Sequence, residues 1–190
     1  MKDPSCLPYN RESAVKVAEK VWRSLKKDNL LSSYNEQVQQ ILDRKAAVKL
    51  SIEEMNEYKG PTQYISHHPV LKDSVSTPVR MVTNSSFNNA GKSLNSCLAA
   101  GPNSLNPMID VLLRFRCREV AMQYDLSKAY NTMKTGLNER HLRRWVWKFN
   151  EEDEWSDYAF DCVHFGDCCA ATQLEVAKDL VADAGRDIDP

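Results

Sequence analysis

The spacing of the apolar residues changes at Gln63, and this change limits the fold to a mixture of helices and strands. Before it, apolar side chains recur every three or four residues, the spacing that gathers them on one face of a helix. The first such set is Ala14, Val17, Ala18, Val21, Trp22 and Leu25, and the second is Tyr34, Val38, Ile41 and Leu42. After Gln63, short alternating stretches predict strands. We therefore expect an α+β fold in which the helices pack on a sheet.

Two capping signatures mark helix starts in the first part of the chain. Ser33 with Glu36 and Ser51 with Glu54 have the spacing of capping boxes, in which a serine and a residue three positions later bond each other's backbone. The second opens a short helix that ends near Gly60. Residues 1–60 are therefore predicted to form an N-terminal helical segment.

The composition is typical of a soluble globular protein, with 42% hydrophobic and 27% charged residues in a chain of 190. No stretch approaches the roughly 18 apolar residues of a membrane span, and no secretory signal is visible. We expect no membrane partner, an intracellular and cytoplasmic location with the nucleus also open, and six reduced cysteines. The net charge of −1 argues neither for nor against a nucleic-acid partner.

A strand hairpin is predicted after Gln63. Strand pieces at 64–65 and 69–71 precede a turn-like stretch, and residues 79–82 alternate as the returning strand. Lys72 and Arg80 would lie near opposite sides of the hairpin tip. If only the neighbouring sequence is considered, the preferred interpretation is that both cations are ordinary solvated charges on a hairpin.

The last part of the chain is predicted to alternate helices and strands. A helix begins at Pro107 and carries an apolar stripe that we expect to be buried: Met108, Val111, Leu112 and Phe115. A strand over 119–124 ends at Asp125 and is expected beside a hairpin formed by residues 142–165. A helix over 170–184 follows.

Asp125 is the residue with the clearest chemical interpretation. A carboxylate at a strand end suits a hard cation such as Mg²⁺, which prefers oxygen ligands. The alternative is that Asp125 caps the next helix, and local sequence alone favours this alternative.

Several blocks, taken in order, resemble a reverse transcriptase. Residues 124–130 (Tyr-Asp-Leu-Ser-Lys-Ala-Tyr) resemble its first catalytic motif, residues 64–72 with 79–82 its fingers hairpin, and residues 163–166 its template-side glycine segment. Residues 93–95, 101–102 and 112–116 resemble the spacer of the Pao (Bel/Pao) group of retrotransposons. The order and spacing of these blocks agree over about residues 60 to 190.

The resemblance implies a partial right-hand polymerase. Residues 61–104 would be fingers and residues 105–190 a partial palm that stops before the Tyr-x-Asp-Asp motif. The complete enzyme would use Mg²⁺, a nucleoside triphosphate and an RNA or DNA template–primer, in a cytoplasmic retroelement particle. An unpaired palm edge would favour self-association.

The resemblance also implies roles for single residues. Lys72 and Arg80 would contact the incoming triphosphate, and Asp125 would be the catalytic metal ligand. The remaining contacts to the nucleotide or template would come from the Leu126 carbonyl, the amides of Lys128 and Ala129, the Tyr130 ring and Gly166. For Tyr130, an ordinary core position is the alternative.

The sequence departs from the family pattern at Asn84, where an acidic residue is usual, and at Ala170-Ala171, where serine-proline is usual. With no Tyr-x-Asp-Asp motif present, we expect the chain to be inactive alone. Three hypotheses follow: an inactive polymerase portion, a non-catalytic retroelement-derived binding protein, or an unrelated helical interaction protein. The first two require Asp125 at the end of a central strand that faces the fingers hairpin.

Overall fold

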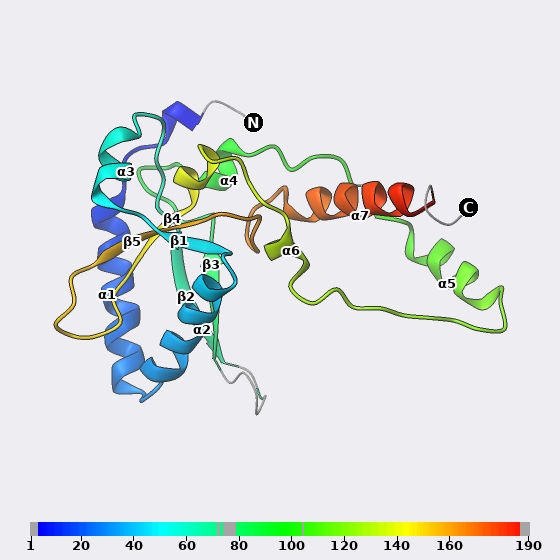
Figure 1. Ribbon diagram of the computed structural model, residues 1–190, viewed down its shortest axis with the longest axis horizontal. Helices are drawn as coiled ribbons and strands as arrows, with labels where there is room; N and C mark the ends of the chain where they lie inside the picture. The colour runs from blue at the N-terminus through cyan, green and yellow to red at the C-terminus, as the bar shows by residue number, and fades with distance from the viewer. Residues whose placement is uncertain (1–3, 72, 74–78, 104, 187–190) are drawn as a thin grey trace.

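A computed structural model describes residues 4–71, 73, 79–103 and 105–186. The fold is α+β, as predicted, with small antiparallel sheets and packed helices (Figure 1). In chain order the elements are η1 (Pro4–Cys6), α1 (Arg11–Lys27), α2 (Leu31–Asp43), β1 (Ala47–Lys49), α3 (Ile52–Glu57), β2 (Ser66–Leu71), β3 (Val79–Asn84), α4 (Leu94–Cys97), α5 (Met108–Arg116), α6 (Ala129–Thr132), η2 (Glu139–Arg143), β4 (Arg144–Trp147), β5 (Ser156–Phe160) and α7 (Ala170–Arg186).

Two sheets form the centre of the molecule. One has three antiparallel strands in the order β1-β5-β4, and the other is the β2–β3 hairpin. The backbone joins them, because Ile65 N–H donates to the Arg144 carbonyl and Arg144 N–H donates to the Gln63 carbonyl. Helix α1 packs against β2 and β4, and α2 packs against β3.

The core lies where these helices meet the sheets. Strand β4 is buried along its whole length, and both of its tryptophans, Trp145 and Trp147, are fully covered. Tyr34 of α2 contacts Trp147, with ring centroids 5.0 Å apart. The predicted packing of the N-terminal helices is confirmed, since Trp22 of α1 is also buried.

One of the two predicted helix starts is confirmed. The Ser51 side chain accepts a hydrogen bond from Glu54 N–H at 3.1 Å and caps α3. The start at Ser33 is wrong, because α2 begins at Leu31 and Ser33 lies inside its first turn. Residues 47–49, which the prediction placed in the helical segment, form strand β1 and pair with β5.

The strand hairpin predicted after Gln63 is confirmed as an antiparallel β2–β3 pair. Val70 lies opposite Arg80, and Ser66 lies opposite Asn84. Lys72 lies outside the described residues, so its predicted side of the hairpin tip stays a prediction.

The hairpin predicted between residues 142 and 165 is confirmed in β4 and β5, but its predicted neighbour is wrong. Residues 119–124 form no strand and make no backbone hydrogen bond with any described residue. The positions beside the hairpin are taken by other segments, since β1 pairs with one edge of β5 and residues 63–65 contact β4. Asp125 therefore does not end a strand.

Residues 105–128 instead form an arm that extends away from the sheets (Figure 1). Helix α5 is present as predicted, but its apolar stripe is not buried: Met108 is 71% exposed and Phe115 is 49% exposed. The predicted burial of this stripe is therefore wrong. Helix α7 confirms the predicted C-terminal helix, and its far end is exposed at Leu180 and Val181. Among the described helices, none has both the length and the apolar character that a membrane crossing requires.

Candidate functional site

Gly166 occupies a backbone conformation that favours glycine. Its φ is +109°, and a Cβ atom at this position would lie 3.1 Å from the Thr83 carbonyl oxygen. Any other residue would combine backbone strain with a close contact to the backbone of β3. The glycine that the resemblance singled out is thus required by local geometry.

The loop around Gly166 is held from two sides. The Thr83 hydroxyl, on β3, donates to the Phe165 carbonyl at 2.7 Å. The Asn95 amide, on α4, donates to the Gly166 carbonyl at 2.8 Å, and its oxygen accepts from Cys168 N–H at 2.9 Å. The end of the β2–β3 hairpin and α4 together fix this loop.

Beneath the loop lies a buried polar cluster of Ser85, His164, Asp167 and Arg143. The Ser85 hydroxyl donates to Asp167 Oδ1 at 2.6 Å, and Arg143 Nε donates to Asp167 Oδ2 at 2.7 Å. Burial lowers the pKa of His164 to about 4, with the Asp167 carboxylate acting in the opposite direction.

This cluster is not a hydrolase triad, although it contains serine, histidine and aspartate. In a triad the histidine lies between the other two groups and takes the serine proton. Here the Ser85 hydroxyl donates to Asp167 Oδ1 and not to His164 Nε2, which lies 3.2 Å away. His164 Nδ1 lies 3.6 Å from Asp167 Oδ2, too far for the hydrogen bond that orients the histidine of a triad. Ser85 is also 1% exposed, so no substrate reaches it. We interpret the cluster as support for the Gly166 loop.

Tyr130 is brought next to this loop. Its ring lies edge to face against Phe165, with the ring centroids 4.4 Å apart. Tyr130 belongs to the short helix α6 and is half-buried. Two of the predicted site residues, Tyr130 and Gly166, are therefore neighbours through Phe165.

The positive charges of two other segments act on Lys128, the residue before α6. Lys128 precedes α6 in a left-handed conformation with φ +55°. Its pKa is lowered, first by partial burial and then by the positive charges of Arg44 and Arg80. None of the three side chains forms an ion pair with a described carboxylate.

Arg44 was not predicted as a site residue. It follows the last turn of α2, where its guanidinium donates to Gln40 Oε1 at 3.2 Å. Lys45, the residue after Arg44, contacts the segment that follows α6, because Lys134 Nζ donates to the Lys45 carbonyl at 2.5 Å. Only the fold brings the end of α2 beside α6. The residues around Arg44 in the sequence therefore could not predict that it belongs to the candidate site.

The catalytic candidate lies apart from these contacts. Asp125 is exposed on the arm and makes no hydrogen bond or ion pair with the described residues. The Leu126 carbonyl accepts from Ala129 N–H at 3.4 Å, so these two backbone groups face each other. No contact within the described residues joins Asp125 to Arg80, and their predicted shared cleft stays a prediction.

The described residues do not fit a magnesium site. They contain no group of three histidine, cysteine or acidic side chains that could hold a metal ion. A single exposed carboxylate is a weak ligand for Mg²⁺, which loses its water shell reluctantly. No chemical step through a metal follows from this arrangement.

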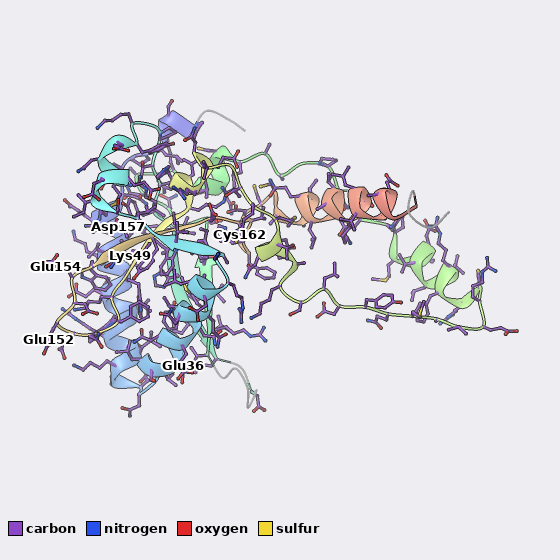
Figure 2. All side chains as sticks on the ribbon, in the orientation of Figure 1. Glu36, Lys49, Glu152, Glu154, Asp157 and Cys162 are labelled. Carbon is purple, nitrogen blue, oxygen red and sulfur yellow. The ribbon has the colours of Figure 1, made fainter. Side chains whose placement is uncertain are left out.

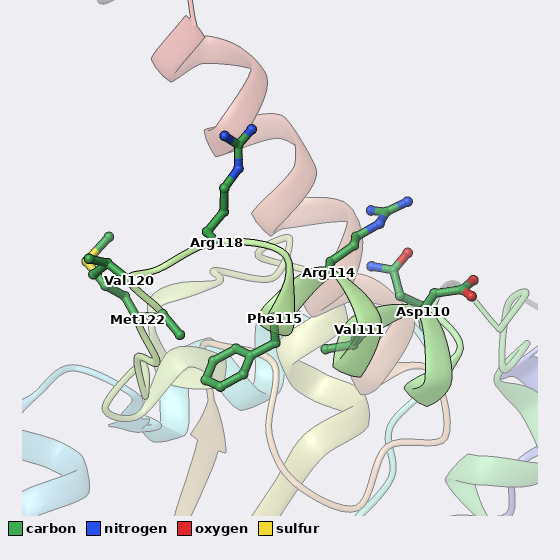
Figure 3. A pocket seen from close by; sticks show the side chains of 9 residues that line it. Asp110, Val111, Arg114, Phe115, Arg118, Val120 and Met122 are labelled. Atoms are coloured by element: carbon green, nitrogen blue, oxygen red, sulfur yellow. The ribbon is translucent and has the colours of Figure 1, made fainter.

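The arm holds a cavity of about 350 Å³ between α5 and residues 118–122. Figure 3 shows Phe115 of α5 reaching towards Val120 and Met122 of the extended segment. None of the predicted site residues lines it. It is a gap between an exposed helix and the chain that follows, separate from the Gly166 loop.

No known family model matches the chain, and no curated protein matches it.

Proposed function

We propose that this chain is a phosphate-binding element of the reverse-transcriptase type, with fingers and a partial palm of the Pao group, and that it binds nucleic acid without polymerising. The observation that carries the proposal is that the positive charges of Arg44 and Arg80 act on Lys128, while none of the three side chains forms an ion pair with a described carboxylate. Positive charges that act on one another in this way are stabilised by a polyanion, because its phosphates offset their repulsion.

The neighbouring residues supply the other surfaces that nucleic acid requires. Tyr130 offers an aromatic ring beside Gly166, where the chain carries no side chain. Aromatic rings stack on bases, and cations on the same face neutralise the backbone. A template–primer end or a nucleoside triphosphate has both groups, and we propose these as the partners.

Catalysis is not part of the proposal for these 190 residues. Asp125 lies on the exposed arm and ends no strand, which argues against an assembled catalytic centre. Two-metal phosphoryl transfer needs several carboxylates around ions about 3.5–4 Å apart. The position of Asp125 does not meet the requirement that both polymerase-derived hypotheses place on it. The resemblance therefore rests on the sequence blocks and on the β2–β3 hairpin, and the second hypothesis, a non-catalytic retroelement-derived binding protein, makes the same binding prediction.

Self-association is a further part of the proposal. The extended residues 119–124 make no backbone hydrogen bond within the described residues, and the side chains of Val120, Met122 and Tyr124 are exposed. An unpaired extended segment of this kind can pair with the same segment of a second copy. We propose a cytoplasmic location in a retroelement particle, with the nucleus as the alternative.

Binding of a fluorescent RNA–DNA template–primer, followed by anisotropy across a salt series, tests the proposal. Replacing Arg44, Arg80 or Lys128 by alanine should weaken binding and lower the slope of log K against log salt by about one unit each. The matched control is Lys20→Ala, which removes an exposed cation on α1. Equal losses in the control and the three variants would assign the binding to overall charge and reject this site.

Primer extension tests the absence of catalysis. The purified chain, given Mg²⁺ or Mn²⁺ and all four nucleoside triphosphates, should extend no primer that it binds. Asp125→Asn serves as the control. Extension by the wild-type chain that disappears in this variant would show that a second carboxylate joins Asp125, and would reject the non-catalytic proposal.

A further inference from the structure

Two cysteines that are 91 residues apart in the sequence meet at the N-terminal end of the molecule. The Sγ atoms of Cys6 and Cys97 lie 3.6 Å apart. Cys6 ends η1 and is exposed, whereas Cys97 ends α4 and is 3% exposed. In the described part of the chain, no other two thiols approach to hydrogen-bonding distance.

Each segment that carries a thiol is already held in place. Leu7, beside Cys6, is buried in the core, and Lys92 Nζ donates to the Cys6 carbonyl at 3.0 Å. The backbone of Cys97 lies in a helix whose first residue, Leu94, is 1% exposed. The two sulfurs therefore meet because of the packing of the fold, and they do not require two mobile ends to find each other.

We propose that Cys6 and Cys97 form a reversible intramolecular disulfide, with a low-molecular-weight disulfide such as oxidised glutathione as the oxidant. Closing this bond would require a small movement, since bonded sulfurs lie about 2.05 Å apart.

The exchange proceeds in two balanced steps. The exposed Cys6 thiolate attacks one sulfur of oxidised glutathione, forms a mixed disulfide and releases one glutathione thiolate. The Cys97 thiolate then attacks Cys6 Sγ and releases the second glutathione. The two cysteine sulfurs lose two electrons in total, oxidised glutathione gains them, and the two thiol protons end on the two released glutathione molecules. Burial raises the pKa of Cys97, so the second step becomes faster at alkaline pH.

The bond would tie the N-terminal segment to the helix that supports the Gly166 loop. Asn95, two residues before Cys97, holds both the Gly166 carbonyl and Cys168 N–H. On the other side, Asn10 bonds the backbone of Tyr64 through both side-chain atoms at 2.8 Å. Oxidation would thus brace α4 against the body of the protein. This inference depends neither on the proposed nucleic-acid binding nor on the resemblance to reverse transcriptases.

Peptide mapping of the full chain tests the proposal. The reduced protein is incubated at pH 8 with a series of reduced-to-oxidised glutathione ratios, then alkylated and digested without reductant. Trypsin cleaves after Lys92, Arg116 and Lys148, so Cys97, Cys117 and the three C-terminal cysteines fall on different peptides. We expect one linked pair that joins the peptides of Cys6 and Cys97, together with a higher urea midpoint that returns to its original value with dithiothreitol.

Two variants separate a specific pair from general thiol oxidation. Cys6→Ser, an exposed change, should abolish both the linked peptide and the gain in urea midpoint. Cys117→Ser, which removes another exposed thiol, should leave both unchanged. Persistence of Cys6 as a glutathione adduct with Cys97 still free, or a link from Cys6 to any other cysteine, would overturn the proposal.

Discussion

The ring of Tyr130 lies edge to face against Phe165, the residue before Gly166, with the centroids 4.4 Å apart. Phe165 is 66% exposed with this contact in place. The contact joins α6, which follows the exposed arm, to the loop that β3 and α4 hold. The arrangement of the candidate site therefore depends on the conformation of one glycine and on the strands around it.

Replacing Gly166 by alanine should destabilise the protein by about 1–3 kcal/mol. The added Cβ would meet the Thr83 carbonyl at 3.1 Å in a conformation, φ +109°, that alanine rarely adopts. Urea unfolding followed by tryptophan fluorescence measures the change. The control is Gly185→Ala in α7, where a Cβ meets nothing within 4 Å and helix propensity favours alanine. Equal midpoints for both variants would contradict the assigned strain.

Asp157 connects three distant segments, and its loss should be costly. Its carboxylate accepts from Arg11 Nη2 at 2.7 Å and from the Tyr64 hydroxyl at 2.7 Å, and its side chain is 4% exposed. Asp157→Asn leaves the Arg11 charge without its partner, which costs about 3–5 kcal/mol when such a pair is buried and less here, because Arg11 is 33% exposed.

The same urea assay measures this loss against Glu152→Gln. Figure 2 shows Glu152 at the outer turn between β4 and β5, whereas Asp157 lies within the body of the protein. Glu152 is exposed, so its variant should unfold at the wild-type midpoint within error. A loss for Asp157→Asn no larger than for Glu152→Gln would show that the network adds nothing to stability.

Stability should fall as the pH falls from about 6.5 towards 4. Burial is the largest cause that lowers the pKa of His67, His141 and His164, each to about 4. In this range the unfolded chain binds more protons than the folded one, so acid favours unfolding by up to about 1.4 kcal/mol per pH unit for each histidine.

The contacts of His67 explain why the neutral form is required. Its Nε2 lies 3.0 Å from the Val146 carbonyl, which only accepts, so Nε2 carries the proton. Nδ1 then accepts from the Tyr34 hydroxyl at 2.7 Å, and a second proton on the ring would stop Nδ1 from accepting this bond. Urea midpoints at pH 7.5, 6 and 5 measure the slope. His67→Gln should reduce the slope, the exposed His68→Gln should not, and a wild-type midpoint that is constant over this range would refute the assignment.

The features that the sequence predicted well are those that neighbouring residues determine. The Ser51 cap depends only on residues 51–54. The apolar face of α1 depends only on the spacing of residues in successive turns of that helix. The β2–β3 hairpin is likewise a contact between adjacent segments. Local pattern and tertiary structure agree at these places, so the prediction needed no knowledge of the fold.

The predictions that failed concern features that depend on residues far along the chain. A strand at 119–124 needs a neighbouring strand to bond its backbone, and the hairpin edges that would supply one are taken by β1 and residues 63–65. The three-residue strand β1 is too short to show a period. Arg44 and the Cys6–Cys97 pair acquire meaning only when α2 and α4 are placed in space.

The exposed arm should cause the chain to self-associate. Its apolar side chains include Ile109, Leu113 and Met122, which are 68%, 60% and 69% exposed. Monomeric proteins rarely expose a large contiguous apolar surface, and the backbone of residues 119–124, which bonds no described residue, adds an extended edge to the arm. We expect sedimentation velocity to show a concentration-dependent increase in the average sedimentation coefficient.

Met122→Glu should weaken the association about tenfold or more, since it places a charge in the contact of both copies. Ile52→Glu, which changes an equally exposed residue on α3, should leave the association unchanged. A wild-type chain that stays monomeric at all concentrations, or two variants that weaken association equally, would show that the arm is not the contact surface.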